Sequence, residues 1–154
     1  MKTLMIVSAL VLLTEFAEAQ KLKEAEVPIA VKEGFKLAYP GIKAKEWEKE
    51  GDKYEAEFDL KKTETSAVFS TDGKLLETES EIALALLPKT VSEYVSKNYP
   101  GHKITEASKI TETGTGKVYY EAEITKGKDE TDLVFDENGT FLQKEENHAP
   151  NDND

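Results

Sequence analysis

The sequence contains no cysteine, and this absence excludes several kinds of protein. Without thiols, the 154-residue chain can have no disulfide, no thiolate metal site and no cysteine nucleophile. Small exported eukaryotic domains often depend on disulfides, so their absence favours a bacterial protein. Histidine is scarce too, since only His102 and His148 could provide an imidazole base.

Arginine is also missing. All 20 basic residues are lysine, whereas Asp and Glu together number 31, which gives a formal net charge of −11. The chain therefore lacks the guanidinium fork that binds phosphate and carboxylate groups through two hydrogen bonds. Nucleic-acid phosphates need clustered Lys or Arg, so the acidity argues against a nucleic-acid partner. Strong acidity more often keeps a protein soluble than marks a binding site, so charge alone predicts no basic partner.

Residues 1–19 have the pattern of a signal peptide. Lys2 precedes an apolar run from Leu4 to Leu13, and the small residues of Ala17-Glu18-Ala19 predict cleavage before Gln20. The run is shorter than the roughly 20 residues that cross a bilayer, and no other segment could span one. We therefore expect a periplasmic or secreted protein that does not insert into a membrane after cleavage.

Two copies of one unit make up most of the remaining chain. Tyr39-Pro40-Gly41 returns as Tyr99-Pro100-Gly101 at an offset of 60, whereas Tyr54-Glu55-Ala56-Glu57 returns as Tyr120-Glu121-Ala122-Glu123 at an offset of 66. The second copy thus carries six extra residues, which fit best in the region 109–117. We expect repeats at 27–82 and 83–146, preceded by a loose lead-in at 20–26 and followed by a disordered polar tail at 147–154.

Each copy is predicted to be one helix followed by a four-stranded antiparallel meander. Pro28 and Pro88 suit a first helical turn, and Tyr-Pro-Gly ends each helix. The join between the copies, Glu81 to Leu87, is apolar after its first residue and is expected to enter the second helix and to lie against both halves. First strands are predicted at 42–50 and 102–113, and fourth strands at 74–81 and 140–146. Two joined copies give an α+β fold, with an eight-stranded antiparallel sheet, both helices on one face and the other face open.

Alternation along the strands separates a core face from a wet face. Tyr54 and Phe58 belong to the predicted core face, as do Phe69 and its equivalent Phe135. Trp47 is assigned to the wet face because alternation groups it with lysines, although it could instead pack at a strand edge or under a loop. Exposed aromatic residues on an open sheet suit recognition. The predicted partner-binding residues are Trp47, Lys53, Glu55, Glu57, Val68, Tyr119, Glu121 and Glu123.

No residue pattern indicates catalysis or a cofactor. His102 follows a Pro-Gly turn and corresponds to Ile42 in the first copy, and His148 lies in the tail. Carboxylates two residues apart, as in the two Tyr-Glu-Ala-Glu segments, could share a proton or hold Ca²⁺, or could form a solvated strand face. We predict no enzymatic activity, no cofactor and no dedicated metal site.

The repeated pattern resembles the bacterial PepSY-like family, also described as β-lactamase-inhibitor-like. The resemblance covers about residues 27–146 and is carried by the Tyr-Pro-Gly turns, the Tyr-Glu-Ala-Glu segments and the hairpin dipeptides Asp72-Gly73 and Asn138-Gly139. It implies an architecture similar to the β-lactamase inhibitory protein, whose tandem repeat presents a sheet to its enzyme target. It does not imply that target, because the inhibitor's cysteines are missing here and no inhibitory loop can be matched.

These observations lead to two hypotheses of different classes. The first is an exported, non-catalytic binding module that engages a protein or peptide through the open face of its sheet. The alternative is a structural or cation-buffering protein of the cell envelope. Saturable capture of one envelope protein favours the first hypothesis, and stabilisation by calcium without a protein partner favours the second. The sequence does not identify the partner or the oligomeric state.

Overall fold

The computed structural model describes residues 20–146, so the predicted leader, the predicted tail and His148 lie outside the described residues. The described chain forms two compact units. We call residues 20–81 with Ile110–Lys117 the first-repeat unit, and Ile82–Lys109 with 118–146 the second-repeat unit. No helix in this part of the chain is long and apolar enough to cross a membrane.

Both predicted helices are present and end where the sequence indicates. Helix α1 spans Ile29–Ala38 and helix α2 spans Lys89–Asn98, each directly after a proline. At the C-terminal ends, the Tyr39 and Tyr99 amides donate to the carbonyl oxygens four residues earlier, each at 2.8 Å. The following glycines adopt positive φ angles of 80° and 86°, which a residue without a Cβ does at little cost.

Short 3-10 helices precede both α-helices: η1 at Glu24–Glu26 and η2 at Leu84–Leu86. The expectation that the apolar run 82–87 enters the second helix is therefore wrong, since α2 begins only at Lys89. Pro88 fixes an extended connection before the helix, and Leu84 and Leu86 are exposed, whereas Leu87 is buried in the core. Along the chain, each short helix comes directly before the α-helix of its repeat.

Nine strands follow one another across an antiparallel sheet in chain order. The predicted eight were one too few, because Gln20–Leu22 of the expected loose lead-in forms strand β1 and pairs with β2. Three residues are too short to show a periodic pattern. The strands are β1 (Gln20–Leu22), β2 (Glu46–Glu50), β3 (Lys53–Leu60), β4 (Thr63–Ser70), β5 (Leu75–Glu81), β6 (Lys103–Glu112), β7 (Val118–Lys126), β8 (Asp129–Asp136) and β9 (Phe141–Glu146).

The six extra residues of the second copy lie where they were predicted. Strand β6 has ten residues and its counterpart β2 has five, and the link after β6 runs over 113–117 instead of 51–52. The long strand is divided between the two units: the Thr113 amide donates to the Leu76 carbonyl at 2.8 Å in the first-repeat unit, and the Ile82 amide donates to the Ala107 carbonyl at 2.8 Å in the second-repeat unit.

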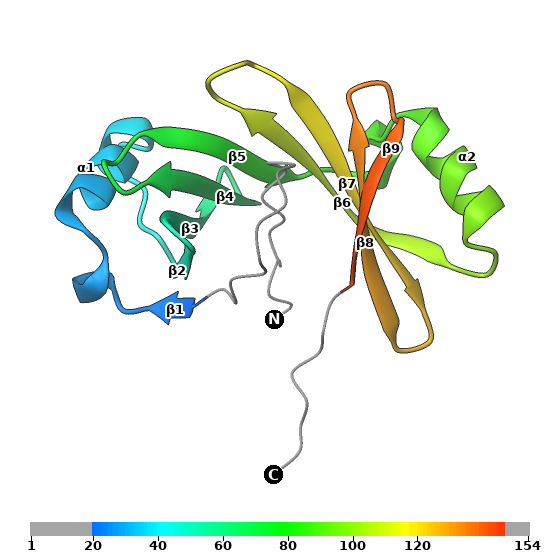
Figure 1. The fold of residues 1–154 in the computed structure, drawn as a ribbon, viewed down its shortest axis with the longest axis horizontal. Coiled ribbons are helices and arrows are strands. Elements are labelled where there is room, and N and C mark those ends of the chain that lie inside the picture. Colours follow the sequence, from blue (N-terminus) through cyan, green and yellow to red (C-terminus); the bar gives the residue numbers. More distant parts are fainter. Residues whose placement is uncertain (1–19, 147–154) are drawn as a thin grey trace, which may run out of the picture. The chain divides into compact units, whose positions relative to one another are not determined.

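Each unit has an apolar core between its helix and one sheet face. In the first-repeat unit α1 packs on β4 and β5 (Figure 1), and Phe35 meets Phe58 edge to face with ring centroids 5.2 Å apart. Phe69 and its equivalent Phe135 are both fully buried, which confirms the predicted strand register. Tyr54 is buried as expected, whereas Tyr120 is only partly buried at the margin of the second core.

Candidate functional site

The open face of the first-repeat unit, meaning the sheet face turned away from α1, consists of two rows of side chains. Strand register places Glu55 between Glu48 of β2 and Val68 of β4. It places Glu57 between Glu46 of β2 and Ser66 of β4. Each row continues into β5 with another glutamate. We call Glu46, Glu48, Glu55, Glu57, Glu77 and Glu79 the acidic face.

Trp47 does not belong to this face, so its assignment to the wet side of the sheet is wrong. It pairs with Ala56 across β2 and β3, is only 5% exposed, and its ring meets that of Phe35 edge to face at 5.5 Å. The assignment rested on Lys45 and Lys49. The Lys49 ammonium lies 6.0 Å from the Tyr54 ring centroid at the margin of the core. A lysine stem covering an aromatic edge is compatible with a core-facing position.

The carboxylates of the open face are far less exposed than a solvated strand would be. Glu55 is 8% exposed, Glu57 9% and Glu121 5%, so the expectation of a wet face is wrong for these residues. Carboxylates also stand directly opposite each other across strands, as Glu48 does with Glu55 and Glu46 with Glu57. Like charges in such positions are destabilising unless a proton or a cation intervenes.

Burial and mutual repulsion make these carboxyls hold their protons unusually well. Loss of water raises the pKa of Glu55 well above its ordinary value of 4.5, and the nearby Glu79 adds to the increase. Loss of water, followed by the charges of Glu46 and Glu48, raises the pKa of Glu57 to about 7. Glu57 thus exchanges its proton near neutral pH.

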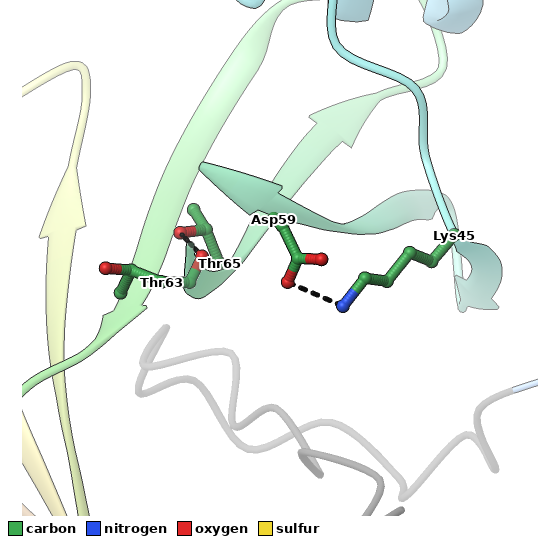
Figure 2. Close-up of polar contacts among 4 residues, drawn as sticks. All are labelled: Lys45, Asp59, Thr63 and Thr65. Atoms are coloured by element: carbon green, nitrogen blue, oxygen red, sulfur yellow. Dashed lines mark hydrogen bonds and ion pairs between the residues drawn. The ribbon is translucent and has the colours of Figure 1, made fainter. Parts of the chain in front are cut away.

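The cations nearest this face are already engaged at its borders. Lys45 Nζ forms an ion pair with Asp59 Oδ1 at 2.6 Å, as Figure 2 shows, and both side chains are about half exposed. Beyond them in the same view, the Thr65 hydroxyl donates to the Thr63 carbonyl at 3.2 Å. Lys21 of β1 pairs with Glu46, and Lys53 lies opposite Glu50 at the far end of the strands. The predicted site residue Lys53 therefore sits at an end of the open face.

The second-repeat unit repeats this face with fewer carboxylates. Glu121 lies opposite Val134 of β8, and Glu123 lies opposite Asp132 of the same strand. The Thr105 hydroxyl donates to Glu123 Oε1 at 2.5 Å. Where the first unit has Glu77 on its last strand, this unit has Gln143, which pairs with Val134. Tyr119 is half-buried and shares the face with Glu121.

No catalytic arrangement appears around the described histidine. His102 is partly buried, and its ring stands edge-on to Tyr99 at 5.6 Å, as expected for a residue after the Pro-Gly turn. Across residues 20–146 no group of three or more His, Asp or Glu side chains is arranged to hold a metal ion. The chemistry that the open faces of the two units can supply is that of carboxylates and other hydrogen-bonding groups, two valines and Tyr119.

Sequence reasoning missed five residues of the open face of the first-repeat unit: Glu46, Glu48, Glu77, Ser66 and Glu79. The last two are the most deeply buried, at about 1% exposed. In β4, alternation places Ser66 on the same face as Val68, so the sequence pattern does indicate Ser66. In β5 the glutamates alternate with Leu76 and Thr78, so the same pattern indicates Glu79.

Comparisons with known proteins agree on one architecture. A crystal structure of a DUF2874 family protein from Bacteroides uniformis is 15% identical, covering 77% of this chain and 88% of that one, with a TM-score of 0.66. One from Bacteroides eggerthii, described as "putative periplasmic", is 16% identical, with coverages of 78% and 88% and a TM-score of 0.65. A BLIP-like protein from Bacteroides fragilis is 22% identical, with coverages of 81% and 89% and a TM-score of 0.59.

At these identities the likeness shows a shared fold and nothing more. No curated protein matches the sequence. The sequence does match the family described as "Putative beta-lactamase-inhibitor-like, PepSY-like", over residues 13–77 and again over residues 59–143. The two matches together cover most of the chain and overlap over residues 59–77. The chain is therefore a member of this PepSY-like, β-lactamase-inhibitor-like family.

Proposed function

We propose that this protein is an exported, non-catalytic binding module of the periplasm, and that it engages a protein or peptide through the open face of its sheet. The observation that carries the proposal is the acidic face itself. A sheet face that bears opposed, buried carboxylates is costly for the fold, and a ligand that neutralises them offsets that cost. The binding residues are Glu55, Glu57 and Val68 in the first repeat, with Tyr119, Glu121 and Glu123 in the second.

Two further observations support export to the periplasm. Residues 1–19 have the composition of a signal peptide. A solved relative with the same fold is described as "putative periplasmic". The family description refers to inhibitors, and inhibition of an enzyme is one way in which a binding module acts.

The proposal is tested by capture followed by titration. Immobilised protein is used to isolate its partner from the envelope fraction of its own host, and the affinity for the purified partner is then measured. Tyr119→Ala should weaken binding by about tenfold or more, because a large aromatic side chain in a desolvated interface contributes strongly. Leu37→Ala is the control, since Leu37 is 85% exposed on α1. A loss of affinity with Leu37→Ala alone would contradict the proposal.

The alternative of a structural or cation-buffering protein is distinguished by one added measurement. If Ca²⁺ raises the unfolding midpoint at neutral pH and no partner is captured, the alternative is favoured over the binding module. If a partner is captured and its affinity depends on Tyr119, the binding module stands. The two results use the same purified chain and need no further variant.

A further inference from the structure

We propose that the acidic face of the first-repeat unit binds a lysine or arginine side chain from an extended segment of the partner, and that Glu55 and Ser66 hold the cationic group. This inference rests on the proposed function and specifies the chemistry of the partner. It concerns one repeat only, since the second-repeat unit has Asp132 at the position equivalent to Ser66.

The first support is an unmet acceptor in a buried position. Glu55 is 8% exposed, and its Oε1 makes no hydrogen bond. Ser66 is 1% exposed and lies diagonally across from it on β4, and its Oγ also lacks a hydrogen bond of normal geometry. Proximity of the Ser66 hydroxyl nevertheless opposes the rise in the pKa of Glu55. A buried polar atom without a partner costs about 1–3 kcal/mol, so a donor placed here is strongly favoured.

The second support is the sign and position of the surrounding charges. Lys45 and Lys21, at the borders of the face, are engaged with Asp59 and Glu46 and not with Glu55. Lys53, two residues before Glu55 on β3, lies opposite Glu50. An ammonium or guanidinium group provides both the positive charge and several N–H donors, and it therefore meets the Glu55 carboxylate and the Ser66 hydroxyl together. Val68 lies beside Glu55 in register and offers an apolar contact for the stem of the side chain.

The spacing of Glu55 and Glu57 favours an extended segment of the partner as the ligand of the acidic face. Glu55 and Glu57 are two residues apart on one strand, which is also the spacing of side chains on one face of an extended peptide. Alternate basic residues of such a segment reach both carboxylates.

Proton release is a consequence of this arrangement. The groups that face Glu55 and Glu57 are Lys21 of β1, Glu46 and Glu48 of β2, Lys53 of the same strand β3, Glu64 and Ser66 of β4, and Glu77 and Glu79 of β5. Burial first, and then the acidic groups among them, raise the pKa of Glu57 to about 7 and that of Glu55 well above its ordinary value. A bound cation favours the ionised carboxylates, so binding expels protons and strengthens as pH rises from 6 to 8.

The test uses two synthetic probes and two variants. One probe is a short peptide of alternating threonine and lysine, and the other has glutamine in place of lysine. Affinities are measured by titration at pH 8 with the wild-type protein, Glu55→Gln and Glu33→Gln. Glu33 is exposed on α1, so Glu33→Gln removes the same charge far from the proposed contact. The Trp47 fluorescence spectrum confirms that each variant is folded.

The expected result is saturable binding of the lysine peptide that Glu55→Gln weakens by about tenfold or more and Glu33→Gln leaves unchanged. Binding to the wild type should also weaken when the pH is lowered from 8 to 6. Equal binding of the glutamine peptide, or equal affinity in both variants, would overturn the inference. So would the absence of binding by either peptide. Failure of the proposed function is a different result, namely a captured partner whose affinity does not depend on Tyr119.

Discussion

A Cβ atom added to Gly34 would lie 2.0 Å from the carbonyl oxygen of Gly73, so α1 and the β4–β5 turn meet backbone against backbone. The second repeat closes the same junction with side chains. Position 94 is a tyrosine whose ring stacks on Phe141 at 4.8 Å, and the Thr90 hydroxyl donates to the Asn138 carbonyl at 2.8 Å. The two copies therefore share a fold but fix the helix to the sheet by different means.

Gly34→Ala is expected to destabilise the protein by about 2 kcal/mol. The new methyl group overlaps backbone that cannot move aside, and such overpacking costs more than the roughly 1 kcal/mol that alanine gains over glycine in a helix. Gly114→Ala is the matched control, because a Cβ there meets nothing within 4 Å. Denaturant unfolding measures both. Equal midpoints for the two variants would show that the helix does not approach the turn this closely.

Trp47→Ala should cost about 3–5 kcal/mol of unfolding free energy, as for a large core aromatic side chain. Phe58→Ala should cost a similar amount, since Phe58 is fully buried against Phe35. Tyr119→Ala should cost much less, because Tyr119 is only half-buried. Urea titration followed by circular dichroism compares the three. A loss of less than about 1 kcal/mol of unfolding free energy for Trp47→Ala would contradict the assignment of Trp47 to the core.

The repeated turns and alternating strands made much of this fold predictable. Phe69 and Phe135 could be assigned to the core because a period of two fixes the face of each side chain. Trp47 could not, since its strand reads Glu-Trp-Glu-Lys-Glu and is polar on both faces. Its position is decided by pairing with Ala56, a contact distant in sequence. The burial of Glu55 depends in the same way on neighbouring strands, which no local pattern contains.

The stability of the protein should fall as pH rises from about 5 to 8, in part because of Glu57. Its pKa of about 7 in the folded protein exceeds the ordinary 4.5, so the folded state binds the proton more tightly. The stabilisation is complete below about pH 4.5 and is lost as pH passes 7. Glu57→Gln stays neutral, so its stability should exceed that of the wild type by about 1 kcal/mol at pH 8, after allowance for solvent screening.

Thermal or denaturant unfolding at a series of pH values checks this prediction. The difference between Glu57→Gln and the wild type is the informative quantity, because groups that do not interact with Glu57 affect both proteins equally. Glu33→Gln provides the control for charge alone, since Glu33 is exposed on α1. Parallel curves for Glu57→Gln and the wild type would show that the pKa of Glu57 is not raised.

The protein purified from its own host should begin at Gln20. Cleavage after Ala19 removes the apolar leader and leaves the chain in the periplasm or medium. Intact-mass analysis and N-terminal sequencing determine the first residue, and fractionation determines the compartment. Recovery of a chain that retains Met1 from the cytosolic fraction would contradict export.

The most direct test of the open-face binding site is site-specific photocrosslinking in living cells. A benzophenone amino acid is placed at Tyr119, where it replaces a ring of similar shape, and separately at Glu48 on the acidic face. Matched positions on the helices are Leu37 of α1 and Ser92 of α2, both exposed. We predict adducts with one common protein from Tyr119 and Glu48 and none from Leu37 or Ser92. Adducts from the two helix positions alone would contradict the account.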